Sequence, residues 1–228
     1  MRQTKEVIAT AYFPVKVYPI KGKDISPMNG RKVKVELDDN IELSFYVTHK
    51  NYSRLITEAT GELVYPNSVF DGLSISWYSG KFSSHKYPHG VGTLGNPILP
   101  LRDFAHSSWP FGSKIIVKNC QAPSRVWYRG DDFGQEQPDN RVDLYTPEKR
   151  DLYRPMKIEV EFPKEIRKTR SGVIKLVQAK LNEILGCRLV IDGIEGPNTL
   201  GAVEDFNLIT SKSYLSACDA ELFFEIQT

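Results

Sequence analysis

The sequence predicts a mainly β amino-terminal domain followed by a small, all-α carboxy-terminal domain. Through the first part of the chain, short runs of alternating apolar and polar residues are separated by Gly, Pro, Asn and Asp, which is the pattern of strands and turns. Beyond the basic stretch KEIRKTRSG, the apolar residues recur at helical spacing instead. We therefore expect one domain over residues 1–163, a linker over 164–170 and a second domain over 171–228.

Composition and charge limit the classes of function. The chain has 228 residues, of which 40% are hydrophobic and 25% charged, and this is enough to bury a core without cross-links. The net charge of +2 provides no strong field for nucleic acid or for an anionic membrane, so neither partner is expected. The first residues, MRQTKEVIATAYFP, lack the apolar core of a signal peptide, and no window approaches the ~18 apolar residues of a membrane span.

The expected strands follow one another along the first domain. Residues 7–15 form a mostly apolar run, and further strand-like segments lie at 32–37, 41–47 and 73–77. The stretch SISWYSGKFSSHKYPHGVGTLGNP is rich in aromatic residues, Gly and His, and is expected to be a surface loop. A last alternating run over 156–162 is typical of a strand that closes a sheet.

The stretch with the clearest chemical pattern contains two separated acids. It begins FAHSSWPFGSKIIVKN and ends DDFGQEQPDNRVDLY, with Asp132 before a polar loop and Asp143 within an alternating strand. Carboxylates at the ends of neighbouring strands can share a sugar oxygen, and glycosidic chemistry needs one acid that donates a proton in the transition state. Asp131 and Asp132 are adjacent, so on a strand only one of them can face a shared groove.

These residues also carry a resemblance to known families. AHSSWPFGS resembles the A-H-x-x-x-P-F-G-T signature of the rare-lipoprotein-A and expansin group, and D-x-G followed by R-V-D-L resembles its later motifs. The spacing from Asp132 to Asp143 is also similar to that of membrane-bound lytic transglycosylase A and of the three-aspartate domain. The resemblance implies a six-stranded double-psi β-barrel that binds glycan in an open groove. It covers residues 95–150 well, and it implies that residues 16–90 are an inserted β-rich segment forming the other wall of the cleft.

The same resemblance implies a reaction and assigns roles. A lytic transglycosylase cleaves the β-1,4 bond between N-acetylmuramic acid and N-acetylglucosamine and leaves a 1,6-anhydro end. Position in the motif makes Asp143 the acid and base, and the Asp-x-Gly spacing selects Asp132 as the supporting carboxylate, which leaves Asp131 solvated. Partial burial and a second carboxylate are expected to raise the pKa of the acid. His106 is expected to orient substrate or to stabilise developing charge.

The sequence departs from the three-aspartate pattern at one position, and His106 and Asp143 also have alternative, structural roles. The first aspartate of the three-aspartate pattern falls near Ala105 or His106, so either His106 replaces it or Asp103 does so from a shifted position. A lone histidine is more often a structural residue with satisfied hydrogen bonds. Asp143 has an alternative role too, as a carboxylate that binds backbone amides and holds the strand crossover.

Several residues near the expected groove are candidates for glycan contact, because the apolar faces of sugars pack on aromatic planes. These candidates are Tyr12, Thr60, Trp77, Tyr78, Arg141 and Tyr145. Tyr12 is otherwise plain core, and Thr60 with Gly61 is otherwise a simple turn. No metal and no cofactor is expected, since His85 and His89 have a spacing that suits a metal only in a helix and Pro88 argues against one.

The second domain is expected to contain three helices. Apolar residues over 173–185 have helical spacing and Gly186 follows as a stop, while a short third helix is expected between Ser213 and Phe224. Between them, DGIEGPNTLGAVEDF resembles the D-G-I-x-G-x-x-T-x-x-A-V-x-x-F-Q motif of the three-helix peptidoglycan-binding domain, with Asn207 at the final position.

The matching positions of this motif have a physical explanation. They are Asp192, Gly193, Gly196, Thr199, Ala202, Val203 and Phe206. The Asp-Gly and Gly-Pro pairs make a tight loop, Asn198 or Thr199 can cap the next helix, and the apolar residues supply its buried face. Most motif residues are therefore expected to hold the loop, and the wall-binding role comes from the resemblance.

Two modules that point to the same polymer predict an enzyme that degrades peptidoglycan. Its partner is the glycan strand, and a monomer without cofactor is expected. With no export signal, the protein is expected to be made in the cytoplasm and to act on the wall as a phage endolysin or tail lysin, or as an effector delivered by a secretion system. Two alternatives remain: a muramidase-type hydrolase that uses Asp132 and Asp143 across a water, and a noncatalytic, expansin-like or phage structural protein that binds the wall.

Overall fold

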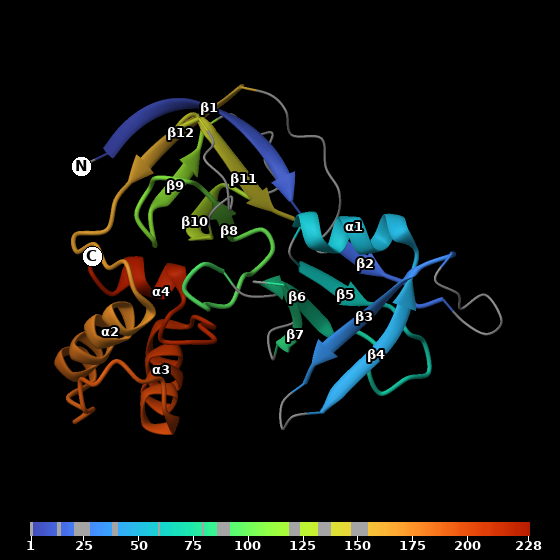
Figure 1. Ribbon diagram of the computed structural model, residues 1–228. Helices are drawn as coiled ribbons and strands as arrows, with labels where there is room; N and C mark the ends of the chain where they lie inside the picture. Colours follow the sequence, from blue (N-terminus) through green and yellow to red (C-terminus); the bar gives the residue numbers. More distant parts are fainter. Residues whose placement is uncertain are drawn as a thin grey trace. The chain divides into compact units, whose positions relative to one another are not determined.

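The chain forms two compact units, seen in a computed structural model (Figure 1). The first consists of Met1–Ala11 with Gly92–Thr228, and the second of Tyr12–Val91. The structure describes residues 2–12, 15–20, 28–37, 41–58, 60–78, 80–85, 92–118, 124–131, 138–146 and 155–228. For Tyr12, Glu58, Thr60, Tyr78 and His85 it describes the backbone only.

The first unit contains a closed six-stranded barrel. Its strands are β1 (Arg2–Tyr12), β8 (Asp103–Ala105), β9 (Lys114–Val117), β10 (Val126–Asp131), β11 (Arg141–Tyr145) and β12 (Pro155–Glu161). They follow one another around the barrel in the order β1-β11-β8-β10-β9-β12. β8 and β10 pair in parallel, whereas β12 pairs antiparallel with both β1 and β9 and so closes the barrel, as expected from its alternating sequence.

Strand alternation builds the barrel core. Met156, Ile158 and Val160 on β12 are buried, and the lysine and glutamates between them point outward. The rest of the core is supplied by Val7, Ala9, Phe104, Trp109, Ile115, Val117, Trp127, Val142 and Leu144. Burial of each such aliphatic side chain contributes about 1.5–3 kcal/mol, so the barrel has a core of its own.

In its described residues, the second unit consists of a six-stranded sheet and a helix. The strands are β2 (Val15–Val17), β3 (Arg31–Glu36), β4 (Glu42–Val47), β5 (Thr60–Leu63), β6 (Ser74–Tyr78) and β7 (Lys81–His85), and the helix is α1 (His49–Glu58). The sheet has the order β2-β5-β6-β7-β3-β4. The segments expected as strands at 32–37, 41–47 and 73–77 are confirmed as β3, β4 and β6.

Two features of this unit differ from the sequence prediction. Where a surface loop was expected, β6 and β7 form an antiparallel hairpin in which Ile75 and Phe82 are buried. Ser74 and Ser76 occupy the alternate positions of β6, whereas Ser84 of β7 lies opposite Ile75, so serines on both faces give this hairpin the composition of a loop. Helix α1 was not expected; it buries Leu55 completely against the sheet.

Three helices complete the first unit: α2 (Arg170–Leu185), α3 (Pro197–Thr210) and α4 (Ala220–Glu225). α2 ends as expected at Gly186, which has a left-handed conformation with φ of 65°. The expected cap of α3 at Asn198 or Thr199 is wrong, because the helix already begins at Pro197 and Gly196 is its N-cap. Proline suits the first helical position, since its fixed φ is helical and its missing N–H has no partner there.

The helices and the barrel share a core within this unit. Phe111 and Tyr128 of the barrel belong to the same buried cluster as the residues of α2, α3 and α4. Tyr128 packs on Phe224 with ring centroids 5.9 Å apart, and its hydroxyl donates to Glu225 Oε1 at 2.7 Å. The helical region is therefore packed on the barrel. None of the helices within the described part of the chain has the length and apolar character that crossing a membrane requires.

Candidate active site

Asp143 lies on the outer face of the barrel. Strand β11 pairs with β8 so that Asp143 is opposite Ala105 and Leu144 is opposite Phe104. Leu144 and Phe104 are fully buried in the barrel core, so the alternate positions, Asp143 and Ala105, face outward. The side chain of Asp143 is 15% exposed, and its buried Oδ1 is the oxygen that lies beside Arg141.

A cation and a hydroxyl accompany this carboxylate. Arg141 Nη2 lies 3.5 Å from Asp143 Oδ1, and Arg141 Nε donates to Thr10 Oγ1 at 3.4 Å. Thr10 in turn donates to the carbonyl oxygen of Val142 at 3.4 Å, which ties β1 to β11. The arginine is therefore held beside the acid, where it can balance the charge left on the carboxylate after a proton has been donated.

Sequence reasoning missed Thr10, although the signal was present. Val7 and Ala9 on β1 are buried in the barrel core, so Thr10 occupies the position that alternation directs outward. What the sequence did not reveal is that β1 lies beside β11 in the barrel.

The ring of His106 has the environment of a structural histidine. It has no exposed surface, and it stacks on Trp109 with centroids 3.9 Å apart. Nδ1 accepts hydrogen bonds from the backbone N–H groups of Ser108 and Trp109, at 3.1 and 3.2 Å, and Nε2 donates to the carbonyl oxygen of Asp139 at 3.2 Å. Burial lowers the pKa of His106, so the ring is neutral and holds two loops together. This geometry does not support direct contact with substrate.

Asp103, the alternative to His106, is fully buried instead of facing a groove. Its Oδ2 accepts from the N–H of Leu99 at 2.7 Å and lies 3.4 Å from Arg102 Nη2. The same arginine pairs with Asp219 at 2.9 Å and with Glu221 at 3.5 Å, at the start of α4. Burial raises the pKa of Asp103 to about 7, against the opposing effect of Arg102. Asp103 thus belongs to the contact between barrel and helices.

Of the two adjacent acids of the motif, the structure describes only Asp131. Asp132 lies outside the described residues. Asp131 was expected to be solvated, but its side chain is partly buried and its Oδ1 accepts from Thr93 Oγ1 at 3.0 Å. Its carbonyl oxygen accepts from the N–H of His106 at 3.2 Å, and its partner in β8 is Ala105.

One of the expected glycan contacts, Tyr145, is corrected, and a second, the partly buried Trp77, stays a prediction. Tyr145 is fully buried, so it has no ring face to offer a sugar. Trp77 packs on Phe82 with centroids 4.5 Å apart and lies against the core of the second unit. The side chains of the other aromatic and polar candidates, Tyr12, Thr60 and Tyr78, lie outside the described residues.

The Asp-Gly-Ile motif of the helical region surrounds a buried amide that the sequence analysis did not single out. Gln178 Nε2 lies 2.9 Å from Asp192 Oδ1, 3.1 Å from the carbonyl oxygen of Ile194 and 3.1 Å from Thr199 Oγ1. Its Oε1 accepts from the N–H of Gly193 at 2.9 Å. The bond from Gln178 lowers the pKa of Asp192. These residues hold the loop, in agreement with the physical interpretation of the motif.

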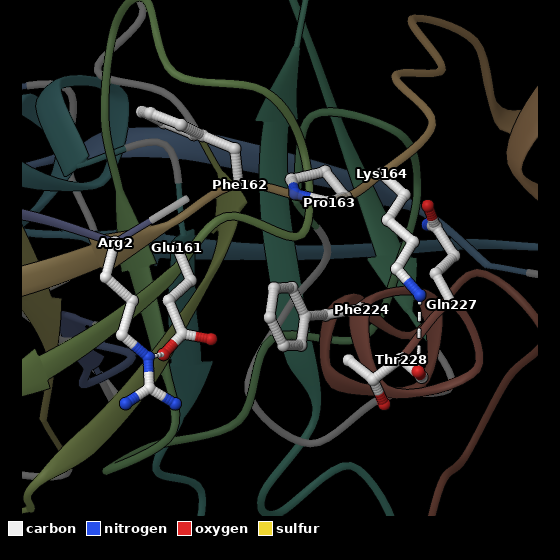
Figure 2. Close-up of a pocket in the computed structure, with 8 residues that line it drawn as sticks. All are labelled: Arg2, Glu161, Phe162, Pro163, Lys164, Phe224, Gln227 and Thr228. Carbon is white, nitrogen blue, oxygen red and sulfur yellow. Dashed lines mark hydrogen bonds and ion pairs between the residues drawn. The ribbon is translucent and has the colours of Figure 1, made fainter.

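A cavity of about 260 Å³ lies elsewhere in the first unit. Figure 2 shows the residues that line it: Arg2, Glu161, Phe162, Pro163, Lys164, Phe224, Gln227 and Thr228. Arg2 Nε pairs with Glu161 Oε1 at 2.5 Å, and Lys164 Nζ donates to the carbonyl oxygen of Thr228 at 3.2 Å. This cavity is lined by none of the predicted site residues whose side chains the structure describes. Among the described side chains, no group of three His, Cys, Asp or Glu is placed to hold a metal ion.

Comparison with solved structures identifies the fold. The structure of MltA from E. coli with bound chitohexaose aligns with a TM-score of 0.51 and 10% sequence identity, over 69% of this chain and 72% of that chain. A membrane-bound lytic murein transglycosylase from Agrobacterium tumefaciens aligns with a TM-score of 0.51 and 10% identity, over 69% of this chain and 74% of that one. The expected likeness in fold to MltA-type lytic transglycosylases is therefore confirmed. No family model and no curated protein matches the sequence.

Proposed function

We propose that this protein degrades peptidoglycan as a lytic transglycosylase, with Asp143 as its acid and base. One observation carries the proposal. Asp143 is a partly exposed carboxylate beside Arg141, on the outer face of a barrel whose fold is similar to that of MltA. We assign the barrel to the double-psi class and the helical region to the peptidoglycan-binding domains, because AHSSWPFGS and DGIEGPNTLGAVEDF resemble the motifs of those families.

The proposed reaction needs one group that first gives and then takes a proton. Protonated Asp143 donates to the glycosidic oxygen as the bond from C1 of N-acetylmuramic acid breaks, and N-acetylglucosamine leaves as the alcohol. The carboxylate of Asp143 then removes the proton from the C6 hydroxyl while O6 attacks C1, which closes the 1,6-anhydro ring. No water is consumed. Between the two steps Arg141, 3.5 Å away, stabilises the negative charge on Asp143.

Other residues support this site through structure. Thr10 accepts from Arg141 and so fixes the direction of the guanidinium. We assign His106 a positioning role, because its ring joins the backbone of Ser108 and Trp109 to that of Asp139. Contacts of Tyr12, Thr60 and Tyr78 with the glycan remain predictions.

We infer that the helical region binds the wall with surfaces next to the Asp-Gly-Ile loop. Asp192, Gly193 and Thr199 are engaged in the loop itself, which leaves ligand contact to neighbouring exposed side chains. Action on the wall after delivery by a phage or a secretion system is part of the same proposal.

Digestion of purified sacculi tests the proposal. Wild type, Asp143→Asn and the matched control Asp205→Asn, an exposed acid on α3, are incubated with sacculi and the soluble products are analysed by mass spectrometry. We expect muropeptides lighter by one water than hydrolytic products from wild type and control, and a rate lower by ~10³-fold with Asp143→Asn. Unchanged release by Asp143→Asn refutes the catalytic assignment, and reducing ends in place of anhydro ends identify a hydrolase.

A further inference from the structure

The geometry points to Asp131, in place of Asp132, as the second carboxylate of the site, facing the sugar whose bond breaks. This inference rests on the proposed function, which it deepens by naming the residue that accompanies Asp143. Sequence spacing favoured Asp132, because Asp132 precedes Gly134 in the Asp-x-Gly pattern. The pairing of three strands favours its neighbour.

Asp131 and Asp143 lie in one row across adjacent strands. β8 is the middle strand, between β11 and β10. Ala105 of β8 is the partner of Asp143 on one side and of Asp131 on the other. Side chains of paired residues share a face of a sheet, so both acids point outward with Ala105 between them.

An irregularity in β10 produces this arrangement. Arg129 pairs with Phe104 and the next pair is Asp131 with Ala105, so Gly130 is an extra residue in the strand. Without this bulge Gly130 would lie opposite Ala105, and Asp131 would point to the other face. Bulges that redirect one side chain are frequent beside active sites.

The bulge is held by close packing around two glycines, Gly130 and Gly92. A Cβ on Gly130 would lie 3.1 Å from Asn96 Nδ2 and 3.3 Å from Ile98 Cδ1. From the same segment, a Cβ on Gly92 would lie 2.1 Å from the carbonyl oxygen of Gly130. Residues 92–98 thus pack directly on the bulge, and Thr93 from this segment donates to Asp131 Oδ1 at 3.0 Å. This hydroxyl holds the carboxylate of Asp131 in place.

The separation of the acids suits a sugar ring. Neighbouring strands are about 4.8 Å apart, so the backbones of β10 and β11 are roughly 10 Å apart across β8. This separation is comparable to the upper end of the ~5–9.5 Å range found for pairs of carboxyl groups that flank a glycosidic bond. Ala105, with a single methyl group, does not separate them. In the oxocarbenium-like transition state, Asp131 would stabilise the positive charge while Asp143 transfers the proton.

Paired variants test the choice between the two adjacent acids. We expect Asp131→Asn to lower the rate of anhydromuropeptide release ~100-fold with an unchanged melting temperature, and Asp132→Asn to retain at least about a third of it. Thr93→Val, which keeps the carboxylate and removes only its hydroxyl partner, is expected to lower the rate ~10-fold. Loss with Asp132→Asn comparable to that of Asp143→Asn, together with an active Asp131→Asn, overturns the inference.

A binding measurement separates this inference from the proposed function. The carboxyl carbon of Asp131 is followed by NMR in wild type during titration with chitohexaose. A change in its chemical shift on binding supports contact with the glycan even if wild type releases no product from sacculi, an outcome that would refute only the proposed reaction. If chitohexaose binds and this signal does not move, Asp131 does not face the sugar and the inference fails.

Discussion

Asp143 in the barrel and Asp192 in the helical region are both motif aspartates, yet their surroundings differ. Asp143 lies on a strand whose backbone is paired by the sheet, and its side-chain neighbours are Arg141 and, through it, Thr10. Asp192 lies in a loop, where its Oδ1 accepts from Gln178 Nε2 and from the N–H of Ile194, both at 2.9 Å. A sheet frees its polar side chains for chemistry, whereas a loop uses them in place of the backbone partners that it lacks.

The same distinction applies within the barrel motif. His106 follows the end of β8, and its ring supplies hydrogen bonds to the backbone of two loops. Asp143 lies in the middle of β11, where the sheet pairs its backbone and Arg141 accompanies its side chain. The comparison therefore predicts which substitutions affect stability and which affect the chemical step.

The largest effect on stability is expected from His106→Ala. Loss of three hydrogen bonds and of the stacking on Trp109 leaves a cavity with unsatisfied N–H groups, which costs about 4 kcal/mol in the free energy of unfolding. Urea unfolding measures it, with Ser108→Ala, which removes only the bond to Asp139 Oδ1, as the mild control. A His106→Ala variant that keeps its stability and loses its activity would indicate that the histidine takes part in the chemical step.

Two glycines of the helical motif provide the next test. Gly193 has a φ of 79° and a Cβ there would lie 2.2 Å from Ser171 Oγ, whereas a Cβ on Gly196 meets nothing within 4 Å. We expect Gly193→Ala to lower the free energy of unfolding by about 3 kcal/mol and Gly196→Ala by less than about 1 kcal/mol. Thermal unfolding of both variants measures the difference. Equal losses would mean that the loop is not held as this geometry implies.

Sequence patterns predicted the helices and strands in which apolar residues recur at a regular spacing. β12 alternates cleanly and α2 repeats its apolar residues until Gly186, so both were located closely. Strand β6 was predicted, but β7 and its pairing with β6 were missed, because serines on both faces of this hairpin gave it the composition of a loop. Helix α1 was missed because few of its residues besides Leu55 are both apolar and buried.

The candidate site was predictable only in part, for a physical reason. Asp143 and Arg141 are two apart on one strand, so alternation alone places them on one face. The orientation of Asp131 depends on the bulge at Gly130 and on the pairing of β10 with β8, and neither is encoded by local periodicity. The burial of Tyr145 likewise depends on tertiary packing, which the alternation of its strand does not reveal.

Asp103 offers a smaller test through pH. Its pKa in the folded protein is raised to about 7 by burial, from about 3.9 in an unfolded chain. Its contribution to stability is therefore fully present below about pH 4 and is lost as the pH rises to about 7. In Asp103→Asn this loss is absent, so we expect the variant to gain about 2 kcal/mol of stability relative to wild type between pH 4 and 7. This is below the maximum of about 4 kcal/mol that one proton can contribute over that range. A constant difference between the two proteins across this range would contradict the prediction.

Asp192 should show the opposite sign and the smallest effect. The bond from Gln178 lowers the pKa of Asp192, so its contribution is present above the unfolded pKa and is lost as the pH falls through the folded value. We expect Asp192→Asn to be slightly less stable than wild type at pH 7 and to approach it below pH 4, because both side chains are then neutral. Urea unfolding at pH 7, 4 and 2 measures this trend beside that of Asp103→Asn. If the two variants diverge from wild type in the same pH range, the contrast between a buried barrel carboxylate and a loop carboxylate held by an amide is incorrect.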